Sequence, residues 1–293
     1  MEELTKCPVC ESNSLSTSFI TKDYFLTKEK FQISKCDSCG FLFTNPRPNP
    51  SELSRFYQSD EYLSHTASKR NLLSSVYSFL RNISIRRKYL LISNLKSKGK
   101  ILDIGCGSGE FLNYLNQRGW GVTGIEPAPK PREFAIEKYG LSIFPETQLN
   151  HFEIESFDVI TMWHVLEHVS GLDERITQVK SLLKNDGLLF IALPNSQSWD
   201  AKHYKEYWAA WDVPRHLYHF TKISFTNFAN KHDLRIHQIY PMRFDSYYVS
   251  LLSEKYKTGK SNFFVASING FLSNLSARRN SGNFSSLIFQ IKK

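Results

Sequence analysis

The sequence has no long hydrophobic run and no leader-like N-terminus. No uninterrupted apolar stretch reaches the roughly 18 residues that a membrane-spanning helix requires, and Met1-Glu2-Glu3 has neither the basic nor the apolar region of a signal peptide. Hydrophobic residues make up 41% and charged residues 22% of the 293 residues, which is typical of a globular protein. We therefore expect a cytoplasmic protein with one large domain and a small additional module.

Acidic residues are missing from residues 71–100, which carry seven basic side chains, whereas residues 101–200 carry a net charge of −7. The whole chain has a net charge of +9, so the basic excess lies on either side of its central segment. Such an excess favours an anionic small-molecule substrate, such as a sugar nucleotide, or a nucleic acid. A basic surface that only contacts solvent is the alternative.

Cysteine is scarce, but four of the five cysteines form two Cys-x-x-Cys pairs, which are Cys7, Cys10, Cys36 and Cys39. In a cytosolic chain this spacing is typical of a tetrahedral structural zinc site rather than of disulfides. The segments 15–24 and 30–35 have the pattern of strands, so we expect a zinc ribbon that depends on its metal for folding. A redox pair, or a site that has lost its metal, is the alternative. The fifth cysteine, Cys106, is expected to pack rather than to react.

Three glycines at alternate positions follow a short apolar segment. The segment is Ile101–Ile104, the glycines are Gly105, Gly107 and Gly109, and an amphipathic stretch begins at Phe111. This pattern predicts a buried strand, a tight turn with positive φ and a helix, with a ligand at the carboxyl end of the strand. The spacing differs from Gly-x-Gly-x-x-Gly, which places a pyrophosphate on a helix N-terminus.

Two acids accompany this turn: Asp103 lies just before it, and Glu126 follows the next predicted strand, residues 121–125. Together with the glycines they resemble the class I S-adenosylmethionine-dependent methyltransferases. S-adenosylmethionine is a cationic nucleoside without phosphate, so carboxylates and bare backbone suit it. The resemblance implies S-adenosylmethionine as cofactor, bound by Asp103, Gly105, Cys106, Gly107, Gly109, Glu126, Pro127, Trp163 and His164. A glycine turn that binds nothing is the alternative.

Strand and helix patterns alternate through the rest of the chain, as in a doubly wound parallel sheet. The fold class is therefore α/β, and the resembled fold implies a mainly parallel, seven-stranded, Rossmann-like sheet whose last strand, 286–291, is antiparallel and lies between strands five and six. We expect a zinc ribbon at 1–46, a helical linker and cofactor-covering segment at 47–98, and the methyltransferase domain at 99–293. The covering role is an analogy that concerns Tyr57, Tyr62 and His65.

A helical insertion is expected at about 241–285. Its second helix, around 262–278, has an apolar stripe formed by Phe263, Phe264, Ile268, Phe271, Leu272 and Leu275. The stripe favours packing or cover of a substrate pocket. A membrane-surface role is the alternative, because Arg278 and Arg279 follow the stripe.

The segment after the fourth strand reads Trp163-His164-Val165-Leu166-Glu167-His168 and resembles the corresponding loop of small-molecule methyltransferases. On one helical face, His164, Glu167 and His168 could also bind a divalent metal. Some O-methyltransferases that act on RNA 3′ ends or quinone precursors have such a cluster, with a glutamate where this chain has His164.

An aromatic segment, residues 207–221, follows the fifth strand and contains Arg215, His216, Tyr218 and His219. It resembles the corresponding segment of sugar-nucleotide C-methyltransferases, in which a histidine that matches His216 acts as base and an acid stands where this chain has Arg215. Those enzymes also have a four-cysteine zinc module. We therefore expect His216 to act as general base, with Arg215, Tyr218 or His219 placing the substrate; bracing of a lid by these histidines is the alternative.

These features predict methyl transfer to a small molecule, plausibly a sugar nucleotide or another glycan precursor. One alternative is an RNA methyltransferase that binds RNA through the ribbon. Against it, residues 1–70 are net neutral and the chain lacks an Asn/Asp-Pro-Pro-Tyr tetrapeptide. A second alternative is a regulatory protein that binds S-adenosylmethionine without catalysis.

Overall fold

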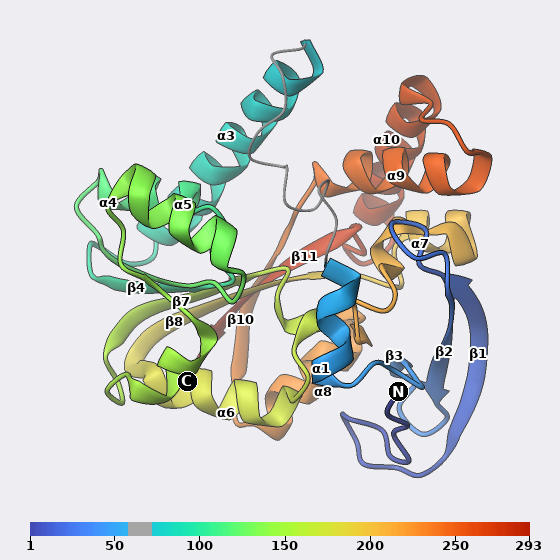
Figure 1. The fold of residues 1–293 in the computed structure, drawn as a ribbon, viewed down its shortest axis with the longest axis horizontal. Coiled ribbons are helices and arrows are strands. Elements are labelled where there is room, and N and C mark those ends of the chain that lie inside the picture. The colour runs from blue at the N-terminus through green and yellow to red at the C-terminus, as the bar shows by residue number, and fades with distance from the viewer. Residues whose placement is uncertain (58–71) are drawn as a thin grey trace. The chain divides into compact units, whose positions relative to one another are not determined.

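The structure is a computed structural model that describes residues 1–57 and 72–293. Tyr62 and His65, which the sequence placed in a cofactor-covering segment, lie outside the described residues. Among those described, the strands form one four-stranded and one seven-stranded sheet (Figure 1). The seven-stranded sheet has the order β10-β11-β8-β7-β4-β5-β6, so the expected seven-stranded α/β sheet is confirmed.

The described chain divides into two compact units, and we describe each by itself. The first unit holds the described residues within Met1–Gln58, His164–Asp173 and Ile191–Ile291, and the second holds those within Ser59–Trp163, Glu174–Phe190 and Lys292–Lys293. Strand β8 (Leu183–Pro194) runs from the second unit into the first. Residues 164–173 and 191–291 belong to the same unit as the N-terminal residues. The boundaries expected at 46 and 98 stay a prediction.

Parallel strands form the centre of the second unit. Strand β4 (Lys100–Ile104) pairs in parallel with β5 (Gly121–Ile125) on one side and with β7 (Phe157–Trp163) on the other, and β5 pairs with the short β6 (Ile143–Phe144). Four of the five residues of β4 are buried, so both faces of this strand are covered, as in other parallel sheets. The carboxyl ends of β4, β5 and β7 therefore meet at one edge of the sheet.

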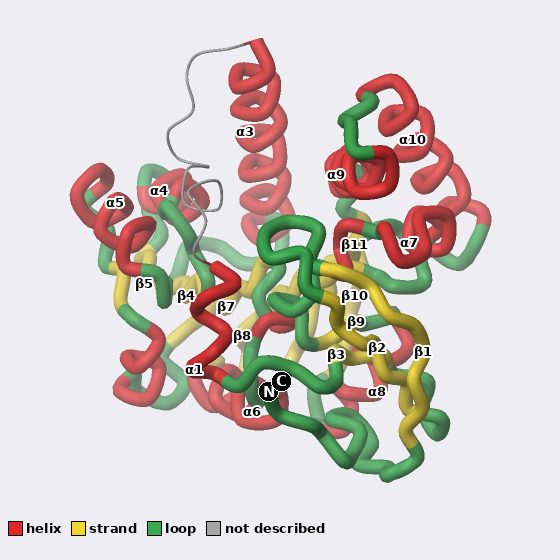
Figure 2. The backbone as a smooth tube through the Cα atoms, turned by 45° about the vertical axis from the view of Figure 1, so that its right-hand side comes forward, coloured by secondary structure: helices red, strands yellow, loops and turns green. Residues whose placement is uncertain are grey.

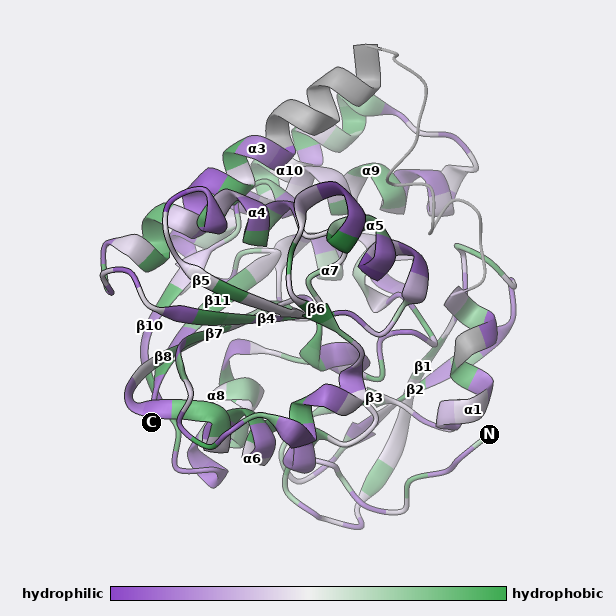
Figure 3. Ribbon diagram, turned by 60° about the vertical axis from the view of Figure 1, so that its left-hand side comes forward, coloured by the Kyte–Doolittle hydropathy of each residue, from purple (hydrophilic) through white to green (hydrophobic). Residues whose placement is uncertain are grey.

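Helices connect these strands, as the alternation predicted. They are α3 (Leu72–Ser93), α4 (Glu110–Asn116), α5 (Pro129–Tyr139) and α6 (Leu172–Leu182), with 3-10 turns η3 (Glu146–His151) and η4 (Leu166–His168). Helix α5 has Pro129 at its first turn and ends at Gly140, whose φ is +62°, which a left-handed C-cap requires. Its sequence is mostly polar, and Figure 3 shows it largely in purple.

The ribbon forms the antiparallel sheet of the first unit. Strand β1 (Leu15–Lys22) pairs with β2 (Lys30–Cys36), and β2 pairs with β3 (Leu42–Thr44), so the two strands expected between the cysteine pairs are confirmed (Figure 2). Strand β3 pairs in turn with β9 (Tyr218–His219), a strand more than 170 residues further along the chain. The ribbon therefore shares its sheet with the aromatic segment 207–221.

The remaining elements of the first unit lie in the C-terminal part of the chain and around residue 54. They are α1 (Pro50–Leu53), η1 (Ser54–Tyr57), α7 (Trp199–Tyr204), η5 (Lys205–Tyr207), η6 (Ala209–Trp211), α8 (Lys222–Lys231), β10 (Arg235–Pro241), α9 (Asp245–Thr258), α10 (Phe263–Arg279) and β11 (Ser286–Lys292). Strand β11 lies between β8 and β10, as expected. In the described part of the chain, no helix is both long and apolar enough to cross a membrane.

Candidate functional site

A glycine turn follows β4 in the second unit. Gly105, Gly107 and Gly109 have φ values of +73°, +55° and +76°, so each adopts a backbone conformation that other residues rarely take. A Cβ at Gly109 would lie 2.9 Å from the Cβ of Ala135, whereas a Cβ at Gly107 would meet nothing within 4 Å. Gly109 therefore permits close packing at the start of α4, and Gly107 leaves open space above the backbone.

Two buried carboxylates lie at the carboxyl ends of the neighbouring strands β4 and β5. Asp103 accepts a hydrogen bond from Thr161 Oγ1 at 2.5 Å. Glu126 accepts two from backbone N–H groups, of Gly107 at 2.8 Å and of Ala128 at 2.9 Å. Glu126 thus ties its own strand end to the glycine turn.

Burial governs the protonation of both acids. It raises the pKa of Asp103 to about 7, and neither the hydrogen bond from Thr161 nor the charge of Lys88 fully offsets it. Burial also raises the pKa of Glu126, against the lowering effect of its two backbone hydrogen bonds. Burial thus disfavours the charged form of both carboxylates. A cationic ligand would stabilise that form, so the two acids are suited to bind one.

Trp163 ends β7 in the same unit. Its ring meets Phe111 edge to face with centroids 5.7 Å apart, and Lys88 Nζ lies 4.3 Å from the centre of a Trp163 ring. The indole Nε1 is buried without a hydrogen-bond partner among the described residues. An unpaired buried donor of this kind is a candidate contact for a bound ligand.

Cys106 lies within the glycine turn, and Pro127 directly follows Glu126. A Cβ at Gly124 would lie 2.7 Å from Cys106 Sγ, so the thiol packs closely against β5. Burial raises the pKa of Cys106 well above its usual range, which keeps the thiol protonated and agrees with a packing role. The Pro127 carbonyl accepts a hydrogen bond from Arg132 at 3.1 Å.

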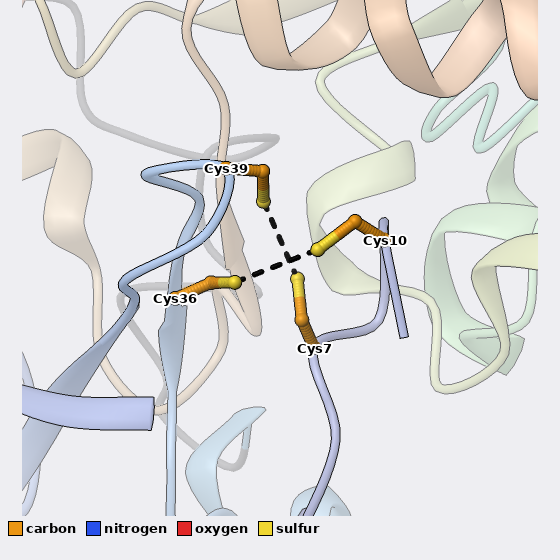
Figure 4. Close-up of side chains that lie close together, drawn as sticks. All are labelled: Cys7, Cys10, Cys36 and Cys39. Carbon is orange, nitrogen blue, oxygen red and sulfur yellow. Dashed lines mark hydrogen bonds between the residues drawn. The ribbon is translucent and has the colours of Figure 1, made fainter. Parts of the chain in front are cut away.

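The four ribbon cysteines converge in the first unit (Figure 4). The sulfur atoms of Cys7 and Cys39 are 3.6 Å apart, those of Cys10 and Cys36 are 3.5 Å apart, and all four lie within 4.8 Å of one another. A tetrahedron with Zn–S bonds of about 2.3 Å has edges of about 3.8 Å, so these separations fit one zinc ion. Gly40, with φ of +75°, closes the second turn.

A second cluster in the first unit is formed by Glu167, His168 and His216, whose ligand atoms also lie within 4.8 Å of one another. Glu167 is fully buried, and neither carboxylate oxygen has a hydrogen-bond partner in the described part of the chain. His164 Nδ1 lies 3.4 Å from Glu167 Oε1, which is an ion-pair distance. A buried carboxylate without hydrogen bonds is costly unless cations or a ligand complete its surroundings.

Both histidines of this cluster are anchored in the same way. His216 Nδ1 lies 2.8 Å from the Ala210 carbonyl, and His168 Nδ1 lies 3.0 Å from the Arg215 carbonyl. A carbonyl only accepts hydrogen bonds, so each of these bonds requires a proton on Nδ1. His168 Nδ1 also lies 3.0 Å from Tyr57 Oη, and His216 Nε2 lies 4.0 Å from Asp212 Oδ2. Burial and the neighbouring His216 lower the pKa of His168 to about 4, so His168 is neutral at pH 7.

His164 has a different environment. Its Nε2 lies 3.0 Å from Asp245 Oδ2, and Asp245 and Glu167 together raise its pKa to about 9 in spite of burial. Burial favours the neutral form of Glu167, but His164 and the other two histidines outweigh it and lower the Glu167 pKa. The sequence grouped His164, Glu167 and His168, whereas the structure brings in His216 from 48 residues further on.

Arg215, Tyr218 and His219 are buried and bonded to other parts of the first unit. Arg215 forms ion pairs with Asp23 at 2.8 Å and Asp212 at 2.7 Å. Tyr218 Oη donates to the Ser170 carbonyl and accepts from Arg47, and His219 Nε2 lies 3.1 Å from Thr44 Oγ1. Of the segment predicted to be catalytic, His216 is the member that joins the Glu167 cluster.

Comparison with known proteins agrees with this architecture. Residues 70–239, more than half of the chain, match the family model described as a methyltransferase domain. The ubiquinone biosynthesis O-methyltransferase of Actinobacillus pleuropneumoniae serotype 5b (strain L20) is 39% identical over 107 residues, covering 33% of this chain and 46% of that protein. The protein of the same name from Methylocella silvestris is 37% identical over 102 residues, covering 33% of this chain and 40% of that protein. The chain thus spans less than half the length of these relatives.

Solved structures share the fold at low identity. A SAM-dependent methyltransferase from Archaeoglobus fulgidus has a TM-score of 0.51 and 18% identity, covering 73% of this chain and 94% of that chain. The geranyl diphosphate C-methyltransferase of Streptomyces coelicolor A3(2), in complex with Mg²⁺, geranyl diphosphate and S-adenosyl-L-homocysteine, has a TM-score of 0.53 and 14% identity, covering 80% and 86%. Together with the family match, the glycine turn and its two acids, this means that the chain belongs to the methyltransferase domain family.

Proposed function

We propose that the protein transfers a methyl group from S-adenosylmethionine to a small-molecule acceptor. The observation that carries the proposal is the glycine turn between Asp103 and Glu126, which combines open backbone at Gly107 with two buried carboxylates. A phosphate-containing cofactor would be repelled by these acids, whereas a sulfonium nucleoside with an ammonium group would be attracted. The family match supports the same cofactor, as does the S-adenosyl-L-homocysteine bound in the related C-methyltransferase structure.

Each predicted cofactor residue has a role in this proposal. Glu126 binds the ribose hydroxyls with the lone pairs that its backbone hydrogen bonds leave free, and Asp103 faces the cationic end. Trp163 offers its unpaired indole N–H and its ring. The other residues, which shape the backbone around the ligand, are Gly105, Cys106, Gly107, Gly109, Pro127 and His164.

The acceptor in this proposal is a small molecule that presents a hydroxyl or an acidic carbon. The names of the curated relatives favour an oxygen acceptor, as in ubiquinone biosynthesis. The basic segments of the chain favour an anionic acceptor, and the four cysteines together with His216 favour a sugar nucleotide. Sugar nucleotides and precursors of ubiquinone are therefore the first two classes to test.

His216 is the candidate general base. Its Nδ1–H is held by the Ala210 carbonyl, so the Nε2 lone pair is oriented and able to accept a proton from the acceptor. The sulfonium is already an activated donor, so alignment of the acceptor and removal of its proton are the remaining tasks. Arg215, Tyr218 and His219 hold the segment that carries His216 and act as positioning residues.

The buried Glu167 carboxylate, which accepts no hydrogen bond from the described residues, favours a second role for the same cluster. One carboxylate and two imidazoles are a donor set that suits a divalent cation, which Glu167, His168 and His216 would hold. A bound ion would lower the pKa of an acceptor hydroxyl and fix its position. In that case His216 is a metal ligand rather than the base.

We also propose that Cys7, Cys10, Cys36 and Cys39 hold a structural zinc ion. Four thiolates within 4.8 Å of one another match a closed site, which has no open position for substrate. The ribbon has a small core of its own, so zinc would contribute to its folding.

Mass spectrometry of small-molecule extracts tests the proposed activity. Extract is incubated with the protein and a donor that carries a CD₃ group, and we expect an acceptor with the mass gain of exchanging H for CD₃. An Asp103→Asn/Glu126→Gln variant serves as control, because it keeps the shape of the site and removes both charges. Tight S-adenosylmethionine binding without any labelled product would favour a regulatory protein, and label in an RNA fraction would favour an RNA methyltransferase.

A further inference from the structure

Helix α10 of the first unit has its polarity inverted. The residues it buries are all small or polar: Ala266, Asn269, Gly270, Ser273, Asn274 and Ala277. Its large apolar side chains face outward, with exposed fractions of 53% for Phe263, 76% for Phe264, 43% for Ile268, 58% for Phe271 and 37% for Leu272. The sequence stripe that favoured packing is therefore on the surface, and the packing expectation is wrong for these five residues.

Specific hydrogen bonds hold the inner face of α10 against its neighbours. These bonds fix the outward orientation of its large apolar side chains. Asn269 Nδ2 donates to Tyr204 Oη at 2.8 Å, and Ser273 Oγ donates to Asp200 at 2.7 Å. Asn274 Nδ2 donates to the Arg243 carbonyl and to Ser246 Oγ, both at 2.9 Å.

Gly270 adds a steric constraint. A Cβ at this position would lie 2.6 Å from the ring of Tyr247 in the neighbouring α9, so the two helices pack at close range there (Figure 1). Rotation of α10 to bury the phenylalanines would break the three sets of hydrogen bonds and lose this fit.

The chain that leads into α10 and through it is basic and contains no acid. Residues 255–291 contain Lys255, Lys257, Lys260, Arg278 and Arg279 and no aspartate or glutamate. All five are exposed, three before the helix and two in its last turn. Apolar patches of this kind mark an interaction site rather than ordinary surface.

We propose that the outer face of α10 docks on an anionic lipid surface, with the helix lying in the plane of the interface. Phenylalanines flanked by lysine and arginine, on a helix of 17 residues, are typical of interfacial helices that insert apolar side chains at the headgroup boundary. The cations would contact the anionic headgroups. A second copy of the chain fits less well, because a two-fold contact through this face would bring the two sets of cations together.

Vesicle co-sedimentation of the full, zinc-loaded chain tests this proposal. We expect binding to vesicles of phosphatidylcholine mixed with phosphatidylglycerol, weaker binding to phosphatidylcholine alone, and loss of binding at high salt. Phe264→Ser combined with Phe271→Ser should weaken binding to the mixed vesicles by at least about tenfold. Arg278→Glu combined with Arg279→Glu should weaken binding to the mixed vesicles and leave binding to phosphatidylcholine alone unchanged.

A matched control is Ile223→Ser, which removes a 62% exposed apolar side chain on α8 of the same unit and should leave vesicle binding unchanged. S-adenosylmethionine affinity should be the same in all variants, which separates docking from the proposed catalytic function. Absence of vesicle binding by the wild-type chain would overturn the proposal. A wild-type dimer in analytical ultracentrifugation that Phe264→Ser/Phe271→Ser dissolves would also overturn it, in favour of a contact between copies.

Discussion

The imidazole rings of His168 and His216 meet edge to face, with centroids 4.5 Å apart and an angle of 79° between their planes. The Nδ1 atom of each ring lies at hydrogen-bond distance from a main-chain carbonyl. Both rings lie beside the buried Glu167 carboxylate, which has no hydrogen bond within the described part of the chain. This relationship joins the loop after β7 to the aromatic segment after β8. Both roles proposed for His216, general base and metal ligand, depend on this arrangement.

Replacement of His216 by alanine is expected to reduce turnover by about 10²–10⁴, because either a positioned base or a metal ligand is lost. S-adenosylmethionine affinity should be unchanged, which isothermal titration calorimetry would measure beside the rate. His203→Ala is the matched control, since it removes an exposed histidine of the same unit. Full turnover by His216→Ala would contradict both roles.

Metal titration separates the two roles. If the cluster is a metal site, calorimetry with Mn²⁺ should detect binding to the wild-type chain and at least about tenfold weaker binding to Glu167→Gln and His168→Ala. Turnover should then fall on dialysis against EDTA and return with Mn²⁺, in a sample whose zinc content is shown by mass spectrometry to be unchanged. A wild-type chain without Mn²⁺ affinity, with turnover that His168→Ala leaves unchanged, would leave His216 as the base.

The affinity for S-adenosylmethionine should depend on pH through Asp103. Burial raises the pKa of Asp103 to about 7, so the free protein increasingly carries a neutral Asp103 as the pH falls below that value. A cationic ligand binds the carboxylate form, so the association constant should fall by up to about tenfold for each pH unit below 7. Above pH 7 it should be flat with respect to this group.

Asp103→Asn provides the control for the pH prediction. It should bind S-adenosylmethionine more weakly at pH 8 and lose the steep dependence below pH 7, because the amide does not titrate. Equal slopes for the wild-type chain and Asp103→Asn would show that another group controls the pH dependence.

Arg215 should be a stability residue, because it neutralises two carboxylates in the interior of the first unit. It is 1% exposed and pairs with Asp23, which is fully buried, and with Asp212. Arg215→Ala should lower the free energy of unfolding by about 3–5 kcal/mol, since it leaves uncompensated buried charge. Urea denaturation would measure it. Arg55→Ala removes an exposed pair with Glu29 and should cost less than about 1 kcal/mol.

Local patterns predicted much of this architecture, and contacts distant in sequence account for the remainder. The glycine turn, the strands beside it and the two cysteine pairs are each encoded within a few residues, so spacing and periodicity were sufficient. The approach of His216 to Glu167 depends on the path of the intervening 48 residues. Asp23 and Arg215 are 192 positions apart in the sequence, and no local sequence pattern predicts their ion pair.

Helix α10 shows a different limit of sequence analysis. Periodicity identified its two faces. The usual rule that the apolar face is buried then predicted the wrong face to be in the interior. The hydrogen bonds of Asn269, Ser273 and Asn274 to α7 and α9 decide the orientation, and their partners are not recognisable without the fold.

Zinc removal should reduce turnover without weakening S-adenosylmethionine binding. Strand β3 of the ribbon pairs with β9, and Thr44 Oγ1 donates to the His216 carbonyl at 2.8 Å, so the ribbon supports the segment that carries His216. The proposed cofactor residues other than His164 lie in the second unit and do not depend on these contacts. Chelation, or Cys10→Ser, should therefore loosen the ribbon and lower kcat, with zinc content measured by mass spectrometry. Cys106→Ser should keep one zinc per chain, because Cys106 lies outside the four-cysteine cluster. Unchanged kcat in a chain shown to be free of zinc would mean that the ribbon does not support the catalytic segment.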